Sequence, residues 1–234
     1  MTIAVNASAV AAGSFAGATT AHVTLTTTAA NCLLVLCAVA EQSTAPSITS
    51  VASTSGLTWN KRTAKTQNLL DIEVWWAVAT SAVTSEVITA TYAAAPDDYA
   101  FVAFGLTGAV NASPWDSNSG VPSFAGLSAA GAPSTTYSTS SANDFVLAVA
   151  GTVTSGVTTP IPTGFTALNS TGTSGGSRAA GINVCYEIVS APQSGTAVTW
   201  GASIGGSNGA GLLVDAIRQP STPVLSRPMQ MLLT

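Results

Sequence analysis

The feature that most constrains the fold of this chain is an internal repeat. One copy runs from about residue 30 to 109 and the other from about 142 to 219. The clearest matches pair residues 30–36 with 142–148, 56–58 with 164–166, and 71–76 with 181–186. Solenoids and propellers use shorter repeats, so two such copies are expected to pack as two layers, each burying one face against the other.

Each copy has the alternation of β-strands. Residues 71–78 divide into two sets, which are Ile72, Val74, Trp76 and Val78 on one face and Asp71, Glu73 and Trp75 on the other. The second copy keeps the same parity over residues 181–188, which supports the register. A period of two is typical of a half-buried strand, so the sequence predicts that Asp71, Glu73 and Trp75 face outward.

The predicted fold is therefore all-β. We expect a two-layer antiparallel β-sandwich of jelly-roll type, built from two internally similar halves and forming a single domain over residues 1–218. Residues 3–25 should add one or two strands to the first sheet. Residues 111–141 should form an ordered crossover with a short strand near residues 135–139.

Residues 219–234 have a different character. Prolines interrupt regular pairing and the last residues are apolar, as shown by Pro220, Pro223, Pro228, Met229, Met231, Leu232 and Leu233. Prolines keep a segment extended, and an apolar chain end exposes hydrophobic surface unless something covers it. The sequence favours an extended tail that docks on a neighbouring molecule, and the alternative is a tail folded back on its own domain.

Charge is scarce in this chain. Charged residues make up 7% of the sequence and the net charge is −4. The one basic cluster, Lys61, Arg62 and Lys65, is typical of a guarded strand edge, so binding to nucleic acid is not expected. The longest apolar run, residues 32–40, is too short to span a membrane, and residues 1–12 lack the pattern of a secretory signal. So little charge suits a surface that other subunits cover.

The sequence predicts a protein that is not an enzyme. His22 is the sole histidine and lies in a threonine-rich segment, and no serine has the G-x-S-x-G pattern of a nucleophile elbow. No metal or cofactor is predicted, because Asp97-Asp98 and Asp116-x-Asn118 lack the number of ligands found in a recognised calcium loop.

The binding or interface candidates are Trp75, Asp71 and Glu73. The Cα atoms of the two acids would lie about 6.6 Å apart on one strand face, a spacing that a glycosidase could use. The second copy has Gly181 and Asn183 at the equivalent positions, which argues against catalysis. An outward Trp75 is instead a candidate for protein contacts or for stacking on a sugar.

The order of several motifs resembles a known family of modules. Residues 33–35, then Gly56-Leu57-Thr58-Trp59, then residues 73–77 resemble the jelly-roll or concanavalin-like sandwiches of tailed-phage virion proteins, which also occur in bacterial surface proteins. The resemblance covers about residues 3–218 and carries no catalytic residues. It implies a structural protein of the virion, either a capsid-surface decoration or head-fibre protein or a tail component.

The same resemblance implies partners and a location. Such a protein is made in the host cytoplasm, joins the virion, forms homo-oligomers, and contacts the major capsid protein or tail proteins through its termini. The apolar tail and the missing leader favour the phage branch of the resemblance over the bacterial surface branch. The alternative is a carbohydrate- or receptor-binding adhesion module that recognises host surface glycans, and a glycosidase is a distant third.

Overall fold

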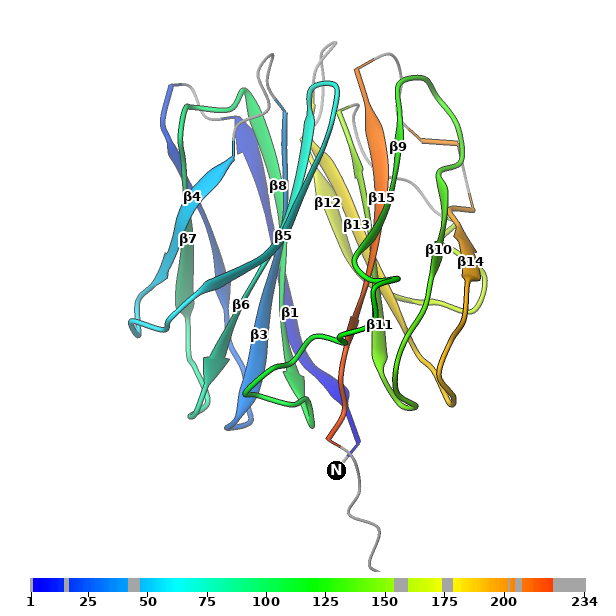
Figure 1. The fold of residues 1–234 in the computed structure, drawn as a ribbon. Coiled ribbons are helices and arrows are strands. Elements are labelled where there is room, and N and C mark those ends of the chain that lie inside the picture. Colours follow the sequence, from blue (N-terminus) through cyan, green and yellow to red (C-terminus); the bar gives the residue numbers. More distant parts are fainter. Residues whose placement is uncertain are drawn as a thin grey trace, which may run out of the picture.

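The computed structural model describes residues 2–14, 17–41, 47–153, 160–173, 179–201, 203–204 and 208–220. In this part of the chain every regular element is an antiparallel β-strand, so the predicted all-β sandwich is confirmed (Figure 1). The first half contains β1 (Ala4–Ser14), β2 (Thr20–Leu25), β3 (Cys32–Glu41), β4 (Ile48–Ser53), β5 (Asn60–Gln67), β6 (Leu70–Ala79), β7 (Glu86–Tyr92) and β8 (Asp98–Thr107). The second half contains β9 (Ser123–Leu127), β10 (Ser134–Tyr137), β11 (Phe145–Thr152), β12 (Thr166–Gly172), β13 (Gly181–Ile188), β14 (Thr196–Thr199) and β15 (Ala210–Ile217).

The strands form four layers, seen side by side in Figure 1. A small sheet, β2-β7-β4, covers one face of a large sheet with the order β1-β8-β3-β6-β5. The second large sheet, β12-β13-β11-β15-β9, packs on the other face of the first. Its own outer face is covered by β10 and β14. Three apolar cores therefore separate the four layers.

The number of layers differs from the sequence prediction. Each copy folds into its own two-sheet sandwich, and the two sandwiches pack through their large sheets. Every residue of β3 and of β11 is buried, because both faces of these strands are covered. A strand buried on both faces reads as a continuous apolar run, as in residues 32–40, rather than as an alternation.

The repeat is confirmed in the topology and extends beyond its predicted bounds. Read from β9, the second large sheet has the order β9-β15-β11-β13-β12, which matches β1-β8-β3-β6-β5 strand for strand. The pairing of β10 with β14 likewise matches the pairing of β2 with β7. Strands β1 and β2 therefore have equivalents in β9 and β10, before the predicted start of each copy. The first copy has eight strands in two facing sheets, the number found in a jelly roll, and seven of them have equivalents in the described part of the second copy.

Backbone details recur between the copies as well. Three turns place a residue in the left-handed region at equivalent positions, which are Asn31 and Asn143, Gly56 and Gly164, and Ser85 and Gly195. Asparagine and glycine adopt this conformation at low cost, and this explains their recurrence at turns in both copies. The hairpin of β5 with β6 and that of β12 with β13 also share a β-bulge, at Arg62 and Leu168.

The two large sheets pack with a pseudo-twofold relationship. Strand β3 lies against β11 at the centre, β1 lies against β12 at one edge, and β5 lies against β9 at the other. Because β12 is the equivalent of β5 and β9 the equivalent of β1, each copy offers the same surface to the other. This is the isologous packing of a twofold homodimer, contained here in one chain.

Candidate functional site

The three residues predicted as binding candidates lie on β6 and alternate as the sequence indicates. The prediction that they face solvent is wrong: the exposed fractions are 6% for Trp75, 2% for Asp71 and 1% for Glu73. Their face of β6 is covered by the small sheet β2-β7-β4. Strand parity separates two faces correctly, but it carries no information about which of them another sheet covers.

Glu73 is held by three groups inside this core. Its Oε1 accepts a hydrogen bond from the backbone N–H of Ile48 at 2.7 Å, and its Oε2 accepts one from Trp75 Nε1 at 2.8 Å. Lys61 Nζ forms an ion pair with the same Oε2 at 2.8 Å and lies 4.9 Å from the centre of the Trp75 ring. The carboxylate therefore ties together β4, β5 and β6, which is a structural role.

Asp71 shares this buried environment. Burial, followed by the charge and hydrogen bond of Glu73, raises the pKa of Asp71 to about 8. Asp71 is therefore largely protonated at neutral pH and hydrogen-bonds directly with Glu73. Two carboxyl groups in direct contact within a core leave no space between them for a glycosidic bond, and no sugar ring reaches a buried Trp75.

Most of the predicted docking tail, residues 219–234, lies outside the described part of the chain. Its named residues, Pro223, Pro228, Met229, Met231, Leu232 and Leu233, lie outside the described residues. Gln219 and Pro220, the first two residues of the predicted tail, are described and follow closely after β15.

Both ends of the described chain meet at one end of the molecule. The backbone N–H of Ile3 donates a hydrogen bond to Gln219 Oε1 at 3.1 Å, and Val110 N–H donates to the carbonyl of Arg218 at 3.0 Å. Figure 1 shows the N-terminus beside the end of β15 at the foot of the sandwich. We call this the terminal end, defined by Ile3, residues 108–118 and residues 216–220.

Residues 110–118 fasten the end of β15 at the terminal end. Arg218 N–H donates to the Pro114 carbonyl at 2.6 Å, and its guanidinium donates to the carbonyl of Ser113. Asp116 N–H donates to the carbonyl of Ala216 at 2.9 Å, and Trp115 forms a β-bridge with Ile217. The base of the tail is thus held by backbone hydrogen bonds on a buried strand.

A buried pair of acids lies under this fastening. Asp116 Oδ1 accepts the N–H of Asn118 at 2.6 Å, and its Oδ2 accepts the N–H of Ser140 at 2.7 Å. Burial works against ionisation of Asp116, but these bonds and one with Asp144 hold its pKa below the ordinary value. Burial and the neighbouring Asp116 raise the pKa of Asp144 to about 8. The pair therefore shares one proton at neutral pH, with Asp144 protonated.

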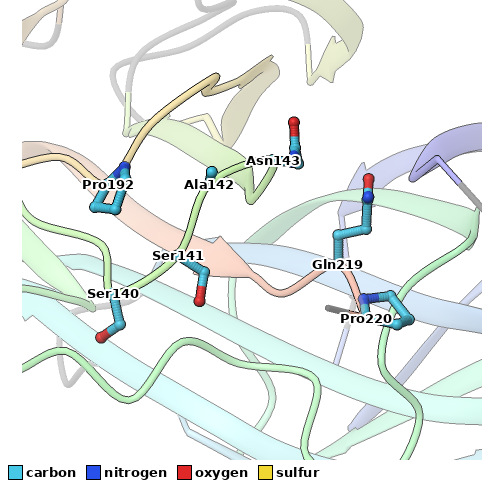
Figure 2. Close-up of a pocket in the computed structure, with 7 residues that line it drawn as sticks. All are labelled: Ser140, Ser141, Ala142, Asn143, Pro192, Gln219 and Pro220. Atoms are coloured by element: carbon cyan, nitrogen blue, oxygen red, sulfur yellow. The ribbon is translucent and has the colours of Figure 1, made fainter. Parts of the chain in front are cut away.

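Two concave surfaces flank the terminal end. Figure 2 shows the first, a pocket of about 350 Å³ lined by Ser140, Ser141, Ala142, Asn143, Pro192, Gln219 and Pro220. The second is a shallow groove of about 320 Å³, whose side chains include Arg62, Trp76 and Trp115. The Arg62 guanidinium lies 5.1 Å from the centre of the Trp115 ring, so one wall of the groove is a cation–π pair.

Sequence reasoning noted Asp116 and Asn118 as a possible calcium loop but missed the partner Asp144. The two acids are 28 positions apart in sequence, and neither copy has a motif that brings them together. In the described residues no group of three or more His, Cys, Asp and Glu side chains is arranged to hold a metal ion. The structure places Asp116 in a turn in which it caps the N–H groups of Asn118 and Ser140.

Comparisons with known proteins give no relative: no family model, no curated protein and no solved structure matches this chain. None of the described residues belongs to a helix of the length and apolar character needed to cross a membrane.

Proposed function

We propose that this chain is a structural protein of a bacteriophage virion, a capsid-surface decoration or head-fibre protein or a tail component, attached through its terminal end. The observation that carries the proposal is the hydrogen bond between Ile3 and Gln219, which brings both ends of the described chain together. A sandwich held in this way offers one end for attachment and leaves the rest of its surface to face outward.

The distribution of charge supports an assembling protein. The chain has ten acidic residues, all within the described part, and eight are buried, namely Glu41, Asp71, Glu73, Glu86, Asp98, Asp116, Asp144 and Asp215. Only Asp97 and Glu187 remain to place negative charge at the surface. Surfaces with little charge associate readily, and interface cores are depleted in Lys, Glu and Asp.

The test is immuno-electron microscopy on phage particles from a lysate of the source culture, with antibody against this chain. Regular labelling of heads or tails is expected, and bare particles beside labelled cell surfaces or free protein would overturn the proposal. A second experiment removes residues 221–234. The shortened chain should keep its thermal unfolding temperature, because the described core is intact, but it should no longer be incorporated into particles.

A second candidate function is binding of host glycans or a receptor. Trp75 no longer supports it, since this side chain is buried, but the groove beside Trp76, Trp115 and Arg62 has the aromatic wall and polar groups of a small ligand site. On a glycan array, Trp76→Ala should remove any signal that the intact protein gives. A blank array for the intact protein would count against this function and would leave the assembly role unaffected.

A further inference from the structure

The two edges of the first large sheet are guarded very differently. Strand β5 forms one edge and carries Lys61, Arg62 and Lys65 over eight residues. Strand β1 forms the other edge, has eleven residues, and contains no charged residue and no proline. Native proteins protect an open strand edge with charges, prolines, bulges or short length, because unpaired backbone groups otherwise recruit another strand. Strand β5 has such protection and β1 has very little.

The edge of β1 is also long and regular. Residues Ala4–Ser14 pair with β8 on one side, and the single irregularity lies at Asn6, between Val5 and Ala7. From Ala7 to Ser14 the strand continues without a bulge. No strand of the described residues pairs with the other side of β1. Eight consecutive residues therefore offer the alternating N–H and C=O groups of an open antiparallel edge.

Side chains along this edge favour a covered surface. Val10 is 40% exposed and is one of two large apolar side chains in the described part with this degree of exposure, the other being Ile188. Strand β12 lies against β1, joined by a hydrogen bond from Asn169 Nδ2 to Ser8 Oγ at 3.2 Å, and it too has no charged residue. One side of the molecule therefore presents two uncharged edges, and that of β1 is the longer.

We propose that two copies of this chain pair through β1, edge to edge and antiparallel. This inference rests on the proposed assembly role and names the surface by which the protein associates with itself. A second copy is the occupant that fits, because an antiparallel strand edge is complementary to itself about a twofold axis. No like charges oppose the approach, and a register centred on Val10 brings the two exposed valines opposite each other. The result is a continuous ten-stranded sheet made from the two first large sheets.

The first test compares Val10→Lys with Ile188→Lys by analytical ultracentrifugation. The two side chains have nearly the same exposure, but Ile188 lies on β13, an interior strand paired on both sides. The wild-type chain and Ile188→Lys should both dimerise, whereas Val10→Lys should weaken dimerisation at least tenfold. A wild-type monomer at all concentrations, or equal dimerisation of all three proteins, would overturn the proposal.

A second test does not depend on destabilising the contact. Val10→Cys should form a disulfide-linked dimer on mild oxidation, because directly opposed residues of an antiparallel pair have Cα atoms about 4.5–5.5 Å apart, which is within the range that a disulfide spans. Ile188→Cys is the matched control and should stay monomeric on a denaturing gel. The three native cysteines are buried, so they give little background. Cross-linking at 188 and not at 10 would place the contact elsewhere and refute the pairing of β1.

These outcomes are separable from the proposed function. A Val10→Lys protein that is monomeric in solution but is still found on particles by antibody labelling would leave the attachment role intact. It would also show that β1 serves self-association and is not needed for attachment. Particles without label, together with a β1-dependent dimer in solution, would overturn the virion role and leave the pairing of β1 standing.

Discussion

Arg62 and Asp215 join the two copies across the central core by a bidentate ion pair. Arg62 Nε lies 2.8 Å from Asp215 Oδ2, and Nη2 lies 3.0 Å from Oδ1. Asp215 has no exposed surface, and Arg62 reaches it from the β-bulge of β5. The pseudo-twofold relates Arg62 to Leu168 and Asp215 to Phe104. Both of these equivalent residues contact the apolar core. One side of the interface between the copies is thus ionic and the other apolar.

This asymmetry predicts the effect of breaking the ion pair. Arg62→Leu leaves a buried carboxylate without its partner, so the free energy of unfolding should fall by about 3–5 kcal/mol. The double variant Arg62→Leu with Asp215→Leu should recover at least half of that loss, because the second copy shows that apolar side chains fit this geometry. Urea unfolding measures both. Lys65→Leu, which removes a partly exposed charge from the same strand, should change stability by less than about 0.5 kcal/mol. If the single and the double variant lost the same free energy of unfolding, the unpaired charge of Asp215 would not be the cause of the loss.

The acid pair at the terminal end predicts a pH dependence. The folded protein keeps the Asp144 proton up to about pH 8, whereas the unfolded chain loses it near pH 4. Between these values unfolding releases a proton, so the free energy of unfolding falls as pH rises. Asp144→Asn cannot ionise and should be more stable than wild type at pH 8, on the order of 1–3 kcal/mol, with little difference at pH 4.

Thermal unfolding across this pH range tests the prediction. Asp97→Asn, the same change at an exposed acid, is the matched control for the loss of one carboxyl group. The pKa of Asp71 is raised to a similar value, so the free energy of unfolding of Asp144→Asn should still decline in part as pH rises. A profile identical to that of the wild-type protein would mean that Asp144 is already ionised in the folded state.

The buried acids of β6 should respond differently to the same kind of change. Glu73→Gln weakens contacts to Ile48, Trp75 and Lys61, so the free energy of unfolding should fall by about 2 kcal/mol. Asp71→Asn replaces a group that is already neutral at pH 7, and it should cost less than about 1 kcal/mol there. Chemical unfolding at pH 7 compares them. A larger loss for Asp71→Asn would reverse the assignment of the charged and neutral partners.

Packing between the copies predicts the cost of a single methyl group. A Cβ at Gly151 would lie 2.8 Å from Ile72 Cδ1 and 2.9 Å from Val39 Cγ2, both on the facing sheet. Gly151→Ala should therefore destabilise the protein by about 1–3 kcal/mol through overpacking. At Gly131 the nearest atom is 3.3 Å away, at the end of the Leu127 side chain, so Gly131→Ala should cost little. Thermal unfolding of the two variants makes the comparison, and similar values would indicate that the central interface relaxes freely.

The sequence by itself determined the repeat, the β class, the strand parity and the turns. These are local properties: the alternation of residues 71–78 and the left-handed Asn31 and Asn143 depend on near neighbours in the chain. It also carried a signal for burial on both faces, in the continuous apolar run of residues 32–40.

Only the tertiary structure decided which faces are covered and which distant residues meet. Parity placed Asp71, Glu73 and Trp75 on one face, but the packing of β2-β7-β4 over that face made it a core. Arg62 with Asp215 and Asp116 with Asp144 are pairs formed by the packing of the copies and by the crossover between them. The local alternation of a strand does not determine contacts between residues that are distant in sequence. Those contacts depend on which faces of the sheets are buried against each other.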